Sequence, residues 1–142
     1  MRSFLLKEKT PITKWGSLPA NTYFEGDTPE GYQKAVSPGI GYIVLDIDMH
    51  GNINGFKNIP KNIDLELPHH FGYPTKNNGR HVWMKYSGNK TLLNKTSGLG
   101  IDLRVANKGY VVWYPKEDVR ECIYKMKKTS KEMNLWLEEL FS

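Results

Sequence analysis

The chain has 142 residues, of which 39% are hydrophobic and 25% charged, and its formal net charge is +5 at pH 7. Such a length suits one compact core and is too short for two ordinary domains, so we expect a single domain over residues 1–142. The composition is typical of a globular chain and excludes a disordered or low-complexity one. The positive charge would favour encounter with a polyanion such as nucleic acid, but a solvated lysine-rich surface without a partner explains it as well.

Cysteine content and hydropathy limit the cellular setting. With Cys122 as its single cysteine, the chain cannot form an internal disulfide or a cysteine-based zinc site. The apolar run Phe4–Leu6 is too brief for a signal peptide, and no apolar stretch is long enough to span a bilayer. We therefore expect a cytoplasmic protein without a membrane partner.

The first half of the chain contains one clear strand. Residues 7–41 are rich in Pro, Gly, Thr and Ser, which predicts a loop-dominated segment that wraps the core with a few short elements. The apolar, β-branched run Gly41–Asp48 predicts a buried strand. It is followed by Met49–Gly55, in which two Gly and two Asn supply the positive-φ positions that a turn needs.

Two further strands follow in the second half. Arg80–Tyr86 and Gly100–Val105 alternate apolar with polar residues, the pattern of a strand with two different faces. A turn at Asn107–Gly109 leads from the second of these into Tyr110–Tyr114. The spacing predicts that the last two strands form an antiparallel hairpin.

Helical patterns appear only at the end of the chain, over residues 117–141. We expect one helix over Glu117–Lys128 and a second over Thr129–Phe141, where Thr129 and Glu132 fit a capping box. The second helix has a core-facing stripe at helical spacing, made of Met133, Trp136, Leu137 and Leu140. Together the elements predict an α+β fold, with a mixed or antiparallel sheet and helices packed on one side.

Three carboxylates on two of the predicted strands form a candidate metal site. Asp46 and Asp48 are two residues apart in a strand, so their side chains share a face, where the two charges repel unless a cation offsets them. An alternative is a strand that ends in a polar turn, where Asp is common. Asp102, on the polar face of another strand, favours the metal cluster, and carboxylate oxygens favour Mg²⁺ or Mn²⁺.

A candidate phosphate contact lies at the start of the strand Arg80–Tyr86. His81 comes directly after a turn that contains Gly79, which would allow close approach of a phosphate, and Arg80, which adds positive charge. A lone histidine is more often structural or merely exposed. The flanking glycine and arginine favour the phosphate-contacting role.

At these positions the sequence resembles the bifunctional DNA primase/polymerase N-terminal (prim-pol) catalytic domain of phages and plasmids, within the archaeo-eukaryotic primase superfamily. The strand Ile43–Asp48 resembles the family's metal-binding acid-x-acid motif, and Asn78–His81 is similar to its phosphate-contacting histidine motif. Gly100–Arg104, followed by Gly109–Val112 and Pro115, resembles the stretch that supplies the third carboxylate. The motifs keep the family's order over residues 39–115.

The resemblance implies a catalytic core of the RRM-like type found in primase-polymerases, and metal-assisted nucleotidyl transfer in DNA replication. Asp46, Asp48 and Asp102 would hold two cations, Mg²⁺ or Mn²⁺, beside the reacting groups. His81, Gly79, Arg80 and Arg104 would bind the triphosphate.

The implied partners are nucleoside triphosphates and a single-stranded or primed DNA template, with a separate helicase or primase-accessory protein. If the chain is phage-encoded, the expected compartment is the host cytoplasm. Two alternatives stay open. One is a non-catalytic nucleic-acid- or partner-binding module of the same fold, and the other is a metal-dependent nuclease or nucleotide hydrolase that uses the same carboxylates.

Overall fold

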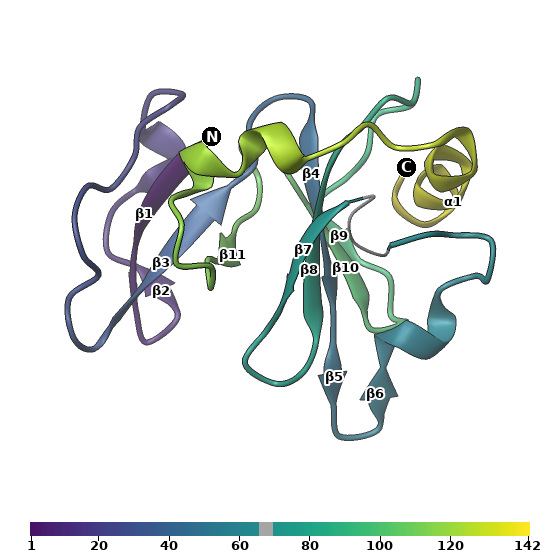
Figure 1. Ribbon diagram of the computed structural model, residues 1–142, viewed down its shortest axis with the longest axis horizontal. Coiled ribbons are helices and arrows are strands. Elements are labelled where there is room, and N and C mark those ends of the chain that lie inside the picture. The colour runs from purple at the N-terminus through teal and green to yellow at the C-terminus, as the bar shows by residue number, and fades with distance from the viewer. Residues whose placement is uncertain (66–69) are drawn as a thin grey trace.

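The computed structural model describes residues 1–65 and 70–142, and within them most of the regular structure is antiparallel sheet (Figure 1). The N-terminal sheet has the strand order β11-β3-β1-β2. Its strands are Val111–Val112, Tyr32–Ser37, Arg2–Lys7 and Thr10–Pro11. The central sheet has the order β7-β8-β4-β10-β9. Its strands are Phe71–Pro74, Arg80–Lys85, Tyr42–Ile47, Ile101–Val105 and Lys95–Thr96.

Short elements complete the described part of the chain. A small hairpin, β5 (Met49–His50) with β6 (Ile53–Asn54), directly follows β4. The α-helix α1 runs over Lys131–Phe141. Four short 3-10 turns are η1 (Trp15–Ser17), η2 (Gly55–Asn58), η3 (Val119–Glu121) and η4 (Ile123–Lys125). No helix among the described residues combines the length and apolar character that crossing a bilayer requires.

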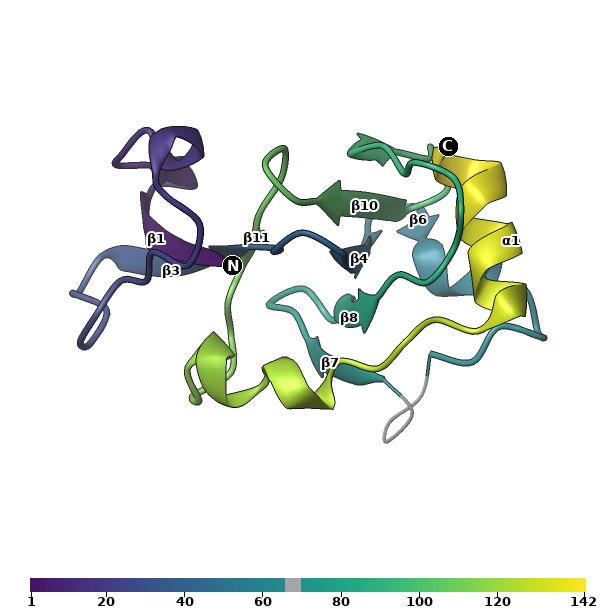
Figure 2. The same cartoon turned by 90° about the horizontal axis from the view of Figure 1, so that it is seen from above.

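The central sheet lies between the N-terminal sheet on one side and α1 on the other, as Figures 1 and 2 both show. Strand β4 explains this arrangement, because its side chains alternate between two apolar cores. Ile43, Leu45 and Ile47 belong to the core that includes α1. Val44 belongs to the second core, which includes Val36 of β3. Both faces of the central sheet are therefore covered, and the fold is α+β with an antiparallel core, as predicted.

Helix α1 forms where the second C-terminal helix was expected. Its buried face is made of Met133, Trp136, Leu137 and Phe141. Ser130, and not Thr129, is the N-cap, because the Ser130 hydroxyl accepts a hydrogen bond from the Met133 amide at 3.1 Å. Thr129 instead binds the segment after β8, where its hydroxyl accepts from the Ser87 amide at 3.0 Å.

The expected helix over Glu117–Lys128 is replaced by the two 3-10 turns η3 and η4. The Asp118 carboxylate caps the first turn by accepting from the Arg120 amide at 2.9 Å. After the second turn the chain becomes extended, so that the Lys85 amide donates to the Lys127 carbonyl at 2.8 Å. This backbone pairing with the end of β8 is incompatible with a helix that continues to Lys128.

One other expectation from the sequence was wrong. The strands β10 and β11 do not form a hairpin, because β10 pairs with β4 and β9, whereas β11 pairs with β3. The chain thus crosses from the central to the N-terminal sheet at the Asn107–Gly109 turn. The segment 7–41 is loop-dominated with a few short elements, as expected, namely β2, η1 and β3, and β3 pairs along its whole length with β1.

Candidate functional site

The candidate site is a row of polar side chains that crosses four strands of the central sheet. Asp102 of β10 is the direct partner of Asp46 on β4, and Asp46 is in turn the partner of His81 on β8. Tyr73 of β7 is the partner of His81 and ends the row. Side chains at directly paired positions point to the same face of a sheet. The antiparallel register therefore brings Asp102, Asp46 and His81 together from three separate strands.

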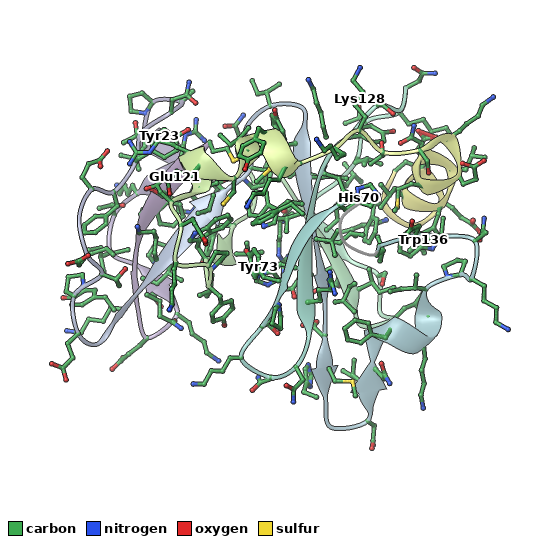
Figure 3. All side chains as sticks on the ribbon, viewed as in Figure 1. Tyr23, His70, Tyr73, Glu121, Lys128 and Trp136 are labelled. Atoms are coloured by element: carbon green, nitrogen blue, oxygen red, sulfur yellow. The ribbon has the colours of Figure 1, made fainter. Side chains whose placement is uncertain are left out.

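This row lies on the face of the central sheet that is turned toward the N-terminal sheet. Val44 and Trp83, each two residues from a member of the row, are buried in the core between the two sheets. Figure 3 accordingly places Tyr73 on the side of β7 that is turned toward the N-terminal sheet, and its ring centroid is 5.4 Å from that of Trp113. The polar row thus borders an aromatic core.

Asp48 reaches the row through a tight contact between two loops. It follows the end of β4, and its backbone amide donates to the Gly100 carbonyl at 2.8 Å, while its carbonyl accepts from the Gly55 amide at 2.8 Å. A Cβ atom on Gly55 would collide with the Gly100 carbonyl oxygen. The absence of side chains at both glycines lets the loop after β4 lie directly against the loop before β10, so Asp48 lies beside Asp102.

The three carboxylates interact electrostatically. Burial, and then the charge of Asp48, raise the pKa of the Asp102 carboxyl to about 6, and a hydrogen bond between the two carboxyl groups acts in the same direction. Burial and then the charge of Asp46 raise the pKa of Asp48. Neighbouring carboxylates that are partly buried favour protonation unless a cation is bound. The side chain of Asp102 is only 13% exposed.

Two basic or ionisable groups flank the carboxylates on this face. An Arg104 guanidinium nitrogen lies 3.4 Å from an Asp102 carboxylate oxygen, two residues along β10. On the other side, His81 Nε2 lies 3.4 Å from Asp46 Oδ1. His81 is almost fully buried, with 4% of its surface exposed. Asp46 and Asp102 therefore lie between a histidine and an arginine.

Gly79 and Arg80 have other surroundings. Gly79 is buried, and a Cβ atom there would collide with the Ile47 carbonyl oxygen, so close packing against β4 already requires a glycine at this position. The alternation of β8 directs the Arg80 side chain to the face opposite His81, where it lines a pocket with Ile59 and Lys61. The structure brings the three aspartates, His81 and Arg104 together, but it does not bring Arg80 to them.

Tyr73 is a contact that sequence reasoning missed. Its hydroxyl lies 3.2 Å from His81 Nδ1. The signal was available in the sequence, because Phe71–Pro74 and Arg80–Lys85 flank the turn-forming segment Lys76–Gly79. A hairpin centred on that turn pairs Tyr73 with His81.

The donor atoms at this site match the chemistry of a hard divalent cation, since carboxylate oxygens are the ligands that Mg²⁺ and Mn²⁺ prefer. The carboxylates do not form a complete ligand set by themselves. Over residues 1–65 and 70–142, no group of three or more His, Cys, Asp and Glu side chains is arranged so that it could hold a metal ion. Mg²⁺ is usually held by one or two carboxylates together with substrate phosphates and water, so such a partial set still fits it.

Comparison with known proteins identifies the family. No curated protein and no solved structure significantly matches the chain. The family model described as "Bifunctional DNA primase/polymerase, N-terminal" matches residues 7–136, a range that includes all three aspartates, His81 and Arg104. Because this match covers most of the 142 residues, the chain belongs to the prim-pol family of bifunctional DNA primase/polymerase N-terminal domains.

Proposed function

We propose that this chain is a metal-dependent nucleotidyltransferase that extends a primer on a DNA template. One observation supports this most strongly, namely the convergence of Asp46, Asp48 and Asp102 from two neighbouring strands on one face of the central sheet. Three partly buried carboxylates without a cation destabilise the local structure through mutual repulsion. Their presence on core strands is explained if they bind a cation together with a triphosphate.

In the proposed complex, Asp46, Asp48 and Asp102 hold Mg²⁺ or Mn²⁺. When bound, such ions would supply activation of a 3′-hydroxyl and stabilisation of the charge on the leaving pyrophosphate. The carboxylates do no proton chemistry of their own. Their task is to be ionised and close together, which fits a site where burial and then like charges raise the pKa of Asp102 until positive charge arrives.

The triphosphate is proposed to lie over Asp46 and Asp102, between His81 and Arg104. Arg104 would exchange its 3.4 Å contact with Asp102 for phosphate oxygens, to which a guanidinium binds in a bidentate manner. His81 Nε2 would donate to the phosphate from the other side, since its 3.4 Å distance to Asp46 is at the long limit of a hydrogen bond. Gly79 would act by holding the β7–β8 turn against β4, and Arg80 lies on the opposite face.

The wider setting is also part of the proposal. Membership of the prim-pol family supports nucleoside triphosphates and single-stranded or primed DNA as partners. The net charge of +5 is compatible with binding a polyanionic template. We further propose that the protein acts in the replication of a phage or plasmid, together with a separate helicase or accessory protein.

A primer-extension assay with labelled primer and Mg²⁺ or Mn²⁺ tests the proposal. We expect Asp46→Asn and Asp102→Asn to reduce extension at least about 1000-fold, because each removes a charged ligand without changing side-chain volume. Asp27→Asn, at an exposed position, makes the same change in net charge and serves as the control. Circular dichroism checks that each variant is folded. Full extension by both site variants would refute the proposal.

A non-catalytic nucleic-acid- or partner-binding module is the second candidate. It is favoured by the lack of a ready-made metal-binding group in the described parts of the chain. Calorimetric titration of Mn²⁺ with and without a triphosphate separates the two, because a pure binding module should show no metal-dependent nucleotide affinity. In the same assays, degradation of primer or triphosphate without extension would indicate a nuclease or nucleotide hydrolase.

A further inference from the structure

His81 is held by a short chain of buried hydrogen bonds that the proposed function does not yet use. The Trp83 indole nitrogen donates to the Tyr73 hydroxyl oxygen at 3.0 Å. The same hydroxyl lies 3.2 Å from His81 Nδ1. All three residues are buried, with exposed fractions of 0%, 8% and 4% for Trp83, Tyr73 and His81. The geometry of these hydrogen bonds determines which ring nitrogen of His81 carries hydrogen.

The direction of each hydrogen bond follows from the groups involved. An indole nitrogen can only donate, so the Tyr73 oxygen accepts from Trp83. The Tyr73 hydroxyl must then place its own hydrogen. Within the described part of the chain, His81 Nδ1 is the acceptor that lies within hydrogen-bond distance of it. Tyr73 therefore donates, and His81 Nδ1 accepts.

The opposite arrangement is less favourable at both ends of the imidazole. If Nδ1 of a neutral His81 carried the hydrogen, the buried Tyr73 hydroxyl hydrogen would lose its acceptor, which is costly in a low-dielectric environment. The lone pair of Nε2 would then face the Asp46 carboxylate oxygen at 3.4 Å, and the two would repel each other. With hydrogen on Nε2, that contact becomes attractive.

We propose that Tyr73, supported by Trp83, is a positioning residue that fixes neutral His81 in the tautomer with hydrogen on Nε2. This directs a hydrogen-bond donor toward Asp46, the side on which the triphosphate would lie. The claim about the tautomer stands on the hydrogen bonds alone, and its consequence for nucleotide binding rests on the proposed function. Tyr73 itself contacts His81 and acts through it.

The ring of Tyr73 is well held for this role. Its centroid lies 5.8 Å from that of Phe71 and 5.4 Å from that of Trp113, both in edge-to-face geometry. The His81 ring packs edge-to-face on Tyr73 at 5.3 Å. The packing of both rings in the aromatic core, together with the hydrogen bond from Trp83, therefore fixes the position of the Tyr73 hydroxyl oxygen next to His81 Nδ1.

Nitrogen-15 NMR of the histidine side chains tests the tautomer without any assay of activity. In the wild-type protein at pH 8, we expect His81 to show a protonated Nε2 and an unprotonated Nδ1, with the His81→Gln variant identifying its signals. In Tyr73→Phe, which removes only the hydroxyl, the two tautomers should mix. Tyr114→Phe is the matched control, because its ring lies 6.0 Å from that of His81 and the variant also loses one hydroxyl. Hydrogen on Nδ1 in the wild type would overturn the proposal, whether or not the variants fold.

Steady-state primer extension tests the consequence for nucleotide binding. Tyr73→Phe should raise the nucleotide KM about fivefold, the effect of one misdirected hydrogen bond, with kcat changed less than about twofold. Tyr114→Phe should leave both constants unchanged. An unchanged KM in Tyr73→Phe, in a preparation whose wild type extends primers, contradicts the positioning role. If the wild type extends no primer, the proposed function fails, and the NMR result alone decides the tautomer.

Discussion

Asp46 and Asp102 are direct partners in the antiparallel ladder between β4 and β10, so two carboxylates project side by side from the same face of the central sheet. Like charges at directly opposed positions destabilise a sheet. The pairing therefore has a cost in the metal-free protein, where burial, then the charge of Asp48 and, to a smaller extent, that of Asp46 raise the pKa of Asp102.

The free energy of unfolding of the metal-free protein should decrease as the pH rises from about 4 to about 6.5. Because the pKa of Asp102 is about 6 in the folded chain and 3.8 is the ordinary value, the folded state binds a proton more tightly than the unfolded state. The free energy of unfolding should therefore fall by up to about 2 kcal/mol between pH 4 and pH 6.5 from this group. Urea unfolding in a chelator, at several pH values, measures the effect.

The variant Asp102→Asn should flatten this pH dependence and be more stable than the wild type at pH 7, since an amide carries no charge. Asp27→Asn provides the control for the change in net charge. A slope in Asp102→Asn equal to that of the wild type would show that another group causes the pH dependence.

The two arginines near the carboxylate strands should differ in their effect on nucleotide binding. Arg104→Ala should raise the nucleotide KM about tenfold, because the proposal gives its guanidinium a charge-assisted contact with phosphate. Arg80→Ala should change KM less than about twofold, since the Arg80 side chain lies on the opposite face. Steady-state extension at varied triphosphate concentration measures both. If Arg80→Ala raised the nucleotide KM more than Arg104→Ala, the triphosphate would not bind on the face that carries Asp46.

Gly55→Ala should damage both the fold and the site. The added methyl group meets the Gly100 carbonyl oxygen, so the loops that carry Asp48 toward Asp102 must separate. We expect a loss of about 2 kcal/mol in the free energy of unfolding, a typical cost of overpacking, together with weaker Mn²⁺ binding. Gly16→Ala is the matched control, because a Cβ atom there meets nothing within 4 Å. Mn²⁺ affinity equal to that of the wild type would show that Asp48 does not depend on this contact.

The packing of α1 gives a prediction that concerns stability alone. Leu137 is fully buried against the central sheet, whereas Leu135, on the same helix, is 66% exposed. Leu137→Ala should lower the free energy of unfolding by about 3 kcal/mol, and Leu135→Ala by less than about 0.5 kcal/mol. Chemical denaturation compares them. Equal losses in the two variants would contradict the packing described for α1.

The parts of the fold that the sequence predicted well are those whose local pattern agrees with their packing. The strand over Tyr42–Ile47 is a mostly apolar run and the helix over Lys131–Phe141 has a periodicity of about 3.6 residues, and both are buried as these patterns predict. Over Glu117–Lys128, the pattern of apolar residues predicted a helix that does not form. The apolar residues Val119, Cys122 and Met126 are buried at helix-like spacing, but two short turns bury them instead.

The remaining errors concern pairing between distant segments. Nothing local to β11 shows that it pairs with β3, about 75 residues earlier in the chain, and not with the adjacent β10. For the site, residue type and spacing were sufficient to select Asp46, Asp48, Asp102 and His81, whereas Arg104 was added by the resemblance to the prim-pol family. The placement of Arg80 was available from the two-residue alternation of β8, which puts neighbours on opposite faces.

The alternation of β10 has a consequence for how this protein can vary. Leu103 and Val105 face the core around α1, while Asp102 and Arg104 face the other way. Deleting one residue within β10 would turn the residues on one side of the deletion to the opposite face, so that a carboxylate would enter the apolar core around α1 and a leucine would take its place on the face that carries Asp46. The proposed activity and the ability to fold would then be lost in a single event. Mutations that change chain length should accordingly be tolerated in the loops beyond this strand and not within it.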